Sequence, residues 1–114
     1  MKKNLFFKQG SIINVIFDPT HGHEQKGHRP AVVVGNNPYS DMTSVMPVTQ
    51  TPPKKPTLMK VSLDERTHTN GYVMIDQCRS MDLASRNAKL IEALPDDLLD
   101  EILERHELIF NKNN

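Results

Sequence analysis

Residues Pro30 to Gly35 read PAVVVG, a continuous apolar run rich in β-branched side chains. Such a run is typical of a strand buried on both faces of a sheet, and a proline is tolerated where a strand begins. Upstream, Ser11 to Phe17 (SIINVIF) contains neither glycine nor proline and also predicts a strand. We therefore expect two buried strands at the centre of the fold.

The chain on either side of these strands predicts more strands and one helix. Further strands are expected at residues 43–49, 57–63 and 71–79, with a loop at 50–56 and a turn at Asn70-Gly71. LASRNA, after Asp82, could form one helical turn, and the following KLIEAL fits either a short strand or a helix. From Pro95, at the first position of a helix, apolar residues recur at three- and four-residue spacing, namely Leu98, Leu99, Ile102, Leu103, His106, Ile109 and Phe110.

These elements predict a mainly β fold with α, a small barrel of five or more short strands closed by a C-terminal helix. With 114 residues and no apparent internal repeat, we expect a single domain over 1–114. Cys78 is the sole cysteine, so an intrachain disulfide is impossible and we interpret it as a small buried hydrophobe. Met1 to Gln9 contains too short an apolar run for a signal peptide or a membrane span. A cytoplasmic protein is the expectation.

The 14 basic and 14 acidic residues give a formal net charge of zero, which argues against a general polyanion-coating protein. The charges are unevenly distributed. Acidic residues concentrate after Pro95, while the first two thirds of the chain are basic on balance. Any nucleic acid is therefore expected to meet a local basic patch.

A dense polar cluster, DPTHGHEQKGHRP, joins the two central strands at residues 18–30. His21, His23, His28 and Glu24 are possible zinc ligands, but their spacing matches none of the known zinc patterns and we expect no metal site. The same cluster suits metal-free RNA cleavage, which needs a base for the 2′-hydroxyl, a cation for the phosphorane and an acid for the leaving oxygen. Arg29 could supply the cation, and Glu24 or His28 could transfer protons. An ordinary solvated loop is the alternative.

Three blocks of the sequence closely resemble the MazF/PemK family of toxins. The first runs from Phe17-Asp18-Pro19-Thr20 through Gly22 and Glu24-Gln25 to Gly27-His28-Arg29-Pro30-Ala31-Val32-Val33. The second is Met46-Pro47-Val48-Thr49, and the third is GYVMIDQCRSMD at residues 71–82. The resemblance covers most of residues 10–110.

The resemblance implies an SH3-like barrel with a C-terminal helix that forms a two-fold homodimer. It implies a toxin that is a sequence-selective, metal-independent endoribonuclease, cutting single-stranded messenger RNA and so stopping translation. The implied catalytic residues are Arg29, Thr49 and Glu24, with Thr51 left open as the alternative hydroxyl. We expect RNA contacts from Asp18, Gln25, His28, Thr51, Lys54, Gln77 and Arg79, and no cofactor.

The implied partner is a small antitoxin, similar to MazE or PemI, whose disordered acidic tail competes with RNA and with which the toxin forms a DNA-binding complex. Two other functions are weighed against this one. A CcdB-like, gyrase-poisoning toxin shares the barrel but does not need Arg29 together with Thr49. A simple RNA-binding barrel would bind RNA without cutting it.

Overall fold

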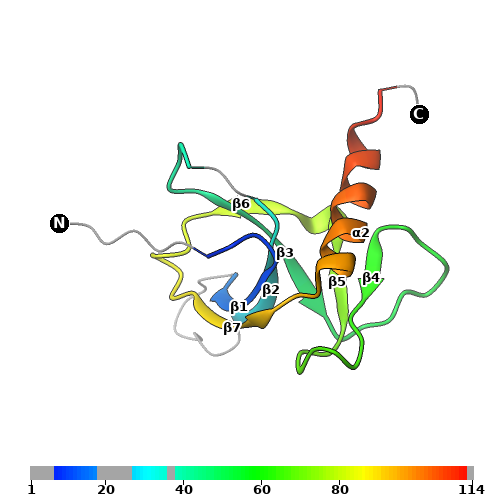
Figure 1. The fold of residues 1–114 in the computed structure, drawn as a ribbon, viewed down its shortest axis with the longest axis horizontal. Helices are drawn as coiled ribbons and strands as arrows, with labels where there is room; N and C mark the ends of the chain where they lie inside the picture. Colours follow the sequence, from blue (N-terminus) through cyan, green and yellow to red (C-terminus); the bar gives the residue numbers. More distant parts are fainter. Residues whose placement is uncertain (1–6, 18–26, 36–37, 113–114) are drawn as a thin grey trace.

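The computed structural model describes residues 7–17, 27–35 and 38–112 (Figure 1). A curved, mostly antiparallel sheet forms the body, and a helix near the C-terminus lies across it. In chain order the elements are β1 (Ser11–Ile16), β2 (His28–Val33), β3 (Thr43–Thr49), β4 (Lys60–Ser62), β5 (Tyr72–Met74), η1 (Ile75–Gln77), β6 (Arg79–Met81), β7 (Lys89–Ala93), α2 (Asp96–Glu107) and η2 (Leu108–Phe110). The predicted mainly β fold with one closing helix is confirmed.

Three predicted strands differ from the observed ones. The strand expected to begin at Pro30 begins two residues earlier, so that Pro30 is the third residue of β2 and lies opposite Asn14. The strand expected over 71–79 is divided into β5 and β6 by the short 3-10 helix η1, because the chain turns inward to bury Ile75. The strand expected over 57–63 is reduced to β4. KLIEAL, which could have been strand or helix, provides β7, and LASRNA forms a hydrogen-bonded turn instead of a helix.

The sheet has seven strands in the order β4-β5-β3-β2-β1-β7, and β6 pairs with β3 beside β5. β1 pairs antiparallel with β2, so that Val15 lies opposite Arg29. β2 pairs antiparallel with β3, with Ala31 opposite Pro47. The two strands that the polar cluster joins, β1 and β2, therefore each lie between two other strands, as their apolar sequences predict.

Two hydrophobic clusters cover the two faces of β1, β2 and β3. Alternate residues on a strand point to opposite faces, and Ile12 accordingly belongs to one cluster and Ile13 to the other. The first cluster lies beneath α2 and includes Leu98 and Ile102. The second includes Val15, Phe17, Ala31, Val33, Val45, Met81, Leu83 and Ala88. Both faces are buried, which explains the continuous apolar run in β2.

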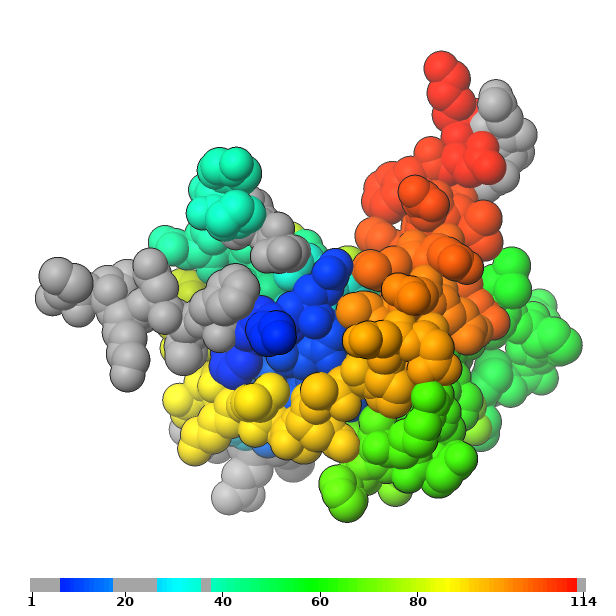
Figure 2. Space-filling model, viewed as in Figure 1, coloured from blue at the N-terminus to red at the C-terminus, as the bar shows by residue number. Residues whose placement is uncertain are grey.

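Helix α2 follows Pro95, which occupies the N-cap instead of the expected first helical position. Asp96 and Asp97 in the first turn face the positive end of the helix dipole. The predicted apolar face of the helix is buried only in part. The helix ends at Glu107, and Ile109 and Phe110 lie in η2, 46% and 71% exposed, because this end extends beyond the body (Figures 1 and 2). None of the helices in the described ranges has the length and apolar character needed to cross a membrane.

Candidate active site

Arg29 and Thr49 flank the same end of the pairing between β2 and β3. The pairing ends where Ala31 lies opposite Pro47, and Arg29 and Thr49 each lie two residues beyond that pair on their own strands. Residues two apart on a strand share a face, so both lie on the face of the second hydrophobic cluster. Arg29 is exposed and Thr49 is partly exposed. A cation and a hydroxyl, 20 residues apart in sequence, thus flank the same end of the β2–β3 pairing.

Thr49 is held in place by its neighbours. Its hydroxyl accepts a hydrogen bond from the Thr51 backbone N–H at 3.2 Å, and its backbone lies opposite Tyr72 of β5. Gly71 precedes Tyr72 with a φ of +128°, and a Cβ there would come within 2.4 Å of the Thr49 carbonyl oxygen. The tight turn predicted at Asn70-Gly71 is wrong, because the chain between β4 and β5 turns earlier, at Glu65 and Arg66. Gly71 instead lets β5 approach the end of β3.

Arg79 joins the same face from β6. It lies opposite Val45 of β3, and directly opposite residues share a face. Its guanidinium carbon is 5.2 Å from the centre of the Phe17 ring, a cation–π contact. Phe17 is 4% exposed, and its N–H donates to the Gly27 carbonyl at 2.9 Å. A buried ring at the end of β1 thus supports an exposed cation.

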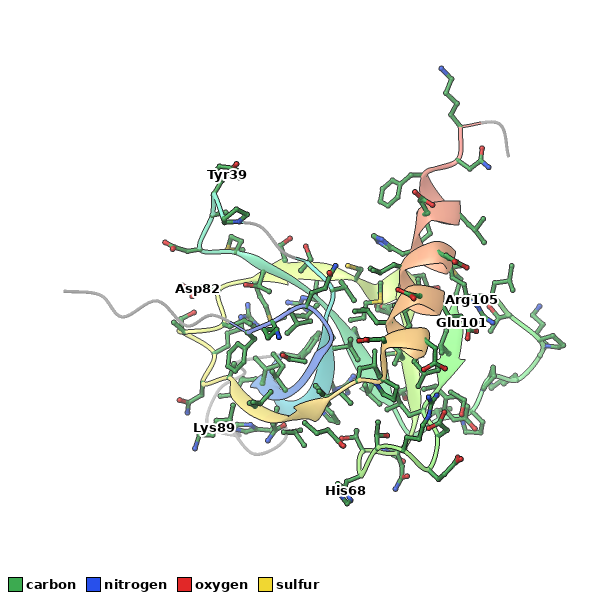
Figure 3. All side chains as sticks on the ribbon, viewed as in Figure 1. Tyr39, His68, Asp82, Lys89, Glu101 and Arg105 are labelled. Carbon is green, nitrogen blue, oxygen red and sulfur yellow. The ribbon has the colours of Figure 1, made fainter. Side chains whose placement is uncertain are left out.

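The five arginines of the chain divide into two groups by their partners. Arg66 pairs with Asp64 and Asp97, and Arg105 pairs with Glu101 four residues earlier on α2 (Figure 3). Hydrogen bonds from Arg66 lower the pKa of Asp64 and Asp97. The other three are Arg29, Arg79 and Arg86, and within residues 7–17, 27–35 and 38–112 none has a carboxylate partner. The second group leaves positive charge available to an anion.

His28 and Arg29 are adjacent in sequence but lie on opposite faces of β2. His28 is opposite Ile16, on the side of the first hydrophobic cluster. Its Nδ1 is buried, and no described residue is hydrogen-bonded to it. The structure therefore does not bring the His28 ring to the Arg29 side chain, and a role for His28 in RNA contact stays a prediction.

The remaining predicted RNA contacts are spread out. Gln77 is exposed in η1, two residues before Arg79, and Thr51 is exposed just beyond the end of β3. Lys54 is exposed in the 50–59 loop, which Figure 1 shows extending past β4 on the side away from β1. Gln77 and Thr51 therefore adjoin elements of the site, and a contact between Lys54 and RNA stays a prediction.

Three predicted site residues, Asp18, Glu24 and Gln25, lie outside the described residues, as do His21 and His23. In the described part of the chain, no group of three His, Cys, Asp or Glu side chains could hold a metal ion. Cys78 packs partly buried against the first hydrophobic cluster, and this burial raises the pKa of its thiol. A raised thiol pKa disfavours the nucleophilic thiolate, in line with the predicted packing role.

Sequence reasoning missed two residues of this region. Phe17 is part of the first resembling block, but nothing in the sequence indicates that its ring lies under Arg79. Arg86 belongs to the LASRNA segment, yet its guanidinium Nη1 donates to the carbonyls of Ile16, at 3.2 Å, and Phe17. These contacts join positions about 70 residues apart, and a local pattern contains no signal for them.

Comparison with known proteins identifies relatives over nearly the whole chain. The endoribonuclease toxin ChpB of Escherichia coli strain K12 is 37% identical over 114 residues, covering 96% of this chain and 98% of its own. Endoribonuclease PemK of Escherichia coli is 37% identical over 103 residues, covering 86% of this chain and 77% of its own. A crystal structure of MazE-MazF from Deinococcus radiodurans matches with a TM-score of 0.74 and 27% identity, covering 90% of this chain and 92% of that one.

These relatives confirm the resemblance and the expected endoribonuclease activity, and they disfavour a gyrase poison or a non-catalytic RNA-binding barrel. The sequence profile of one family, described as PemK-like, MazF-like toxin of type II toxin-antitoxin system, matches residues 8–110. This match includes Arg29, Thr49 and Arg79 with the strands that carry them. The chain therefore belongs to the PemK-like, MazF-like toxin family of type II toxin-antitoxin systems.

Proposed function

We propose that this endoribonuclease toxin cuts single-stranded RNA within a short preferred sequence, without a metal ion, by attack of the RNA's own 2′-hydroxyl. The observation that carries the proposal is that Arg29 and Thr49 each lie two residues beyond the Ala31–Pro47 pair, at the same end of the β2–β3 pairing. A guanidinium and a hydroxyl at one phosphate suit the charge that develops during attack. The exposed charge of Arg79, which has no carboxylate partner among the described residues, adds to the attraction for a phosphate backbone.

Each group has a defined part in the proposed reaction. The 2′-oxygen loses its proton to a base, for which we propose Glu24, and bonds to the adjacent phosphorus. Arg29 binds the non-bridging oxygens in a bidentate manner while negative charge builds up on them. Thr49 orients the phosphate through its hydroxyl. The bond to the 5′-oxygen then breaks, and that oxygen takes up a proton, leaving a 2′,3′-cyclic phosphate and a free 5′-hydroxyl.

The proposed substrate and partners follow from the same surface. Single-stranded RNA exposes its base edges for sequence reading, and messenger RNA in the cytoplasm is the proposed target. The Deinococcus radiodurans relative was crystallised as MazE-MazF. We propose a comparable antitoxin for this chain, with an acidic tail that competes with RNA for Arg29 and Arg79. We also propose that the toxin acts as a two-fold homodimer.

Incubation of the purified protein with a long RNA in excess EDTA, followed by mapping of the cut ends, tests this function. We expect cutting to persist in EDTA at a limited set of sequences and to leave 5′-hydroxyl ends. A matched substrate with one 2′-deoxy nucleotide before the cut should resist, because the attacking oxygen is absent, and DNA should be spared. Activity that is lost with EDTA and restored by a divalent ion would contradict the mechanism.

A further inference from the structure

The end of β1 lacks a strand on one side, and Arg86 takes its place. β2 pairs with β1 as far as Ile16, whereas the pairing with β7 stops where Asn14 lies opposite Lys89. Beyond that point the Ile16 N–H donates to the backbone carbonyl of Arg86 at 3.1 Å. The Arg86 guanidinium donates back to the carbonyls of Ile16, at 3.2 Å, and Phe17. Arg86 thus uses both its backbone carbonyl and its side chain to hydrogen-bond the end of β1 where β7 no longer pairs with it.

Arg86 is itself fixed by the turn between β6 and β7, whose ends are marked by Asp82 and Lys89 in Figure 3. Leu83 and Ala88 of this turn are buried in the second hydrophobic cluster. The N–H groups of Arg86 and Ala88 both donate to the Leu83 carbonyl at 3.2 Å. Asn87, with a φ of 57°, reverses the chain in a conformation that asparagine tolerates. Arg86 is therefore presented to β1 by an ordered support.

Both exposed cations of the candidate site adjoin the segment that Arg86 holds. Arg29 lies opposite Val15, one residue before Ile16, so the end of β1 lies directly beside Arg29. Arg79 lies over the ring of Phe17, whose carbonyl Arg86 binds. A shift of this segment would move Arg29 and Arg79 relative to Thr49, which belongs to β3.

We propose that Arg86 is a positioning residue for RNA cleavage: it fixes the end of β1, and through it Arg29 and Arg79, without touching RNA. The inference rests on the proposed function of the same site. Its guanidinium donors are directed at backbone carbonyls, whereas Arg29 has no such partner among the described residues. Positioning matters because a displacement of about 1 Å can cost about 100-fold in rate.

The test compares Arg86→Met, Arg86→Lys and a control, Arg105→Met. Methionine keeps an unbranched apolar stem and removes the donors, while lysine retains a donor for one carbonyl. Arg105 is a matched control because its Nη1 also donates to two carbonyls, those of Leu58 and Lys60 at 3.4 Å, on the helix side of the molecule. For Arg86→Met we expect kcat to fall about 10- to 100-fold with KM changed less than about 3-fold. Arg86→Lys should be intermediate, and Arg105→Met should cut as the wild type does.

Binding of RNA that carries a 2′-deoxy nucleotide at the cut site separates positioning from direct contact. An arginine that neutralises a phosphate contributes about 0.7 to the slope of log Kd against log salt for single strands. We expect this slope to be unchanged in Arg86→Met. A slope reduced by about that amount with kcat unchanged would overturn the proposal, as would full activity in this variant. If Arg86→Met does not fold, Arg86→Gln, which keeps an uncharged amide donor and removes the charge, replaces it in the same kcat and slope comparison. A wild-type protein that cuts no RNA would refute the proposed function itself, whereas a cutting wild type with a fully active Arg86 variant refutes only this inference.

Discussion

At Arg29, the geometry of one side chain matters more than its charge alone. A guanidinium is planar and presents its donors as a rigid fork that matches two phosphate oxygens, whereas an ammonium is a point charge on a flexible stem. Arg29 is exposed, and among the described residues no carboxylate competes for it. Its fork therefore suits the phosphate that the proposed mechanism assigns to Arg29 and Thr49.

We expect Arg29→Ala to lower the rate of RNA cutting about 100- to 1,000-fold, because a preorganised charge facing the phosphorane is removed. Arg29→Lys should restore little of this loss. Thr49→Ala should cost about 10- to 1,000-fold, since the hydroxyl orients the phosphate or helps to pass a proton. Single-turnover cleavage of a defined RNA measures all three, and thermal unfolding confirms that each variant is folded.

Thr51→Ala is the matched control for Thr49. The Thr51 backbone N–H, which binds the Thr49 hydroxyl, survives this change, and the Thr51 side chain is exposed beyond the strand. Cutting should stay near the wild-type rate. A large loss of cutting in Thr51→Ala together with normal cutting in Thr49→Ala would show that Thr51, and not Thr49, provides the catalytic hydroxyl. If Arg29→Ala did not fold, the result would instead indicate that Arg29 has a structural role only.

How much of this site is predictable differs from residue to residue. Arg29 and Thr49 could be named from sequence, because the blocks around them resemble a known family and each sits at the end of a strand with a clear apolar pattern. Arg86 could not, because its partners are backbone carbonyls of Ile16 and Phe17, and backbone acceptors leave no mark on a sequence. His28 illustrates a third case: its neighbour Arg29 made it a candidate, but strand alternation directs the two to opposite faces.

At the scale of elements, the contact between β5 and the end of β3 controls where Thr49 lies. Gly71 makes this contact possible, and Gln50 reinforces it by donating to the Asn70 carbonyl at 2.7 Å. The sequence predicted a tight turn at these residues because Asn-Gly is a common turn pair, but the hydrogen-bonded turn of this loop lies at Glu65 and Arg66. It did not predict the break between β5 and β6, because YVMIDQCR has strand-like composition throughout and only the burial of Ile75 in the assembled core turns the chain.

Gly71→Ala should both destabilise the protein and impair cutting. A φ of +128° is unfavourable for alanine, and the new Cβ would meet the Thr49 carbonyl at 2.4 Å. We expect a loss of about 2 kcal/mol or more in the free energy of unfolding, measured by urea denaturation. Among molecules that remain folded, cutting should still be slower, because relief of the clash displaces Thr49.

Asn70→Ala provides the control for this turn. Asn70 is exposed, and its backbone carbonyl, which Gln50 binds, is retained in the variant. The free energy of unfolding should change by less than about 0.5 kcal/mol, as for most surface substitutions. If Gly71→Ala proved as stable and as active as Asn70→Ala, the close approach of β5 to Thr49 would matter neither for stability nor for RNA cutting.

For the whole molecule, carboxylates fasten the 63–71 loop to the rest of the structure. Glu92 of β7 accepts hydrogen bonds from the His68 N–H at 3.0 Å and from the N–H and hydroxyl of Thr69, each at 2.8 Å. Burial tends to raise the pKa of Glu92, but these hydrogen bonds outweigh it and the net pKa is lowered from 4.5. Hydrogen bonds from Arg66 lower the pKa of Asp64 and of Asp97 from 3.8. The loop is therefore held by ionised groups.

These lowered pKa values fix the sign of a pH dependence. A carboxyl group with a lower pKa in the folded state adds stability above its unfolded pKa and loses it as the pH falls through its folded pKa. We expect Glu92→Gln to unfold at a lower temperature than the wild type near neutral pH, and the gap to shrink as the pH drops below 4.5, the ordinary Glu92 value. Thermal unfolding across pH measures this. A gap that is constant down to strongly acidic pH would contradict a role for the ionised Glu92.

The division of the arginines into paired and unpaired groups has an electrical consequence for a molecule of zero net charge. Six carboxylates lie on α2, while Arg29, Arg79 and Arg86 lie around the end of β1 without a carboxylate partner among the described residues. We expect the field of these arginines to attract the phosphate backbone of RNA before contact. At low ionic strength, the same field would attract the acidic helix of a neighbouring molecule. Because salt screens exposed charges beyond about 10 Å at 0.1 M, the ions that keep the toxin dispersed also weaken its capture of RNA.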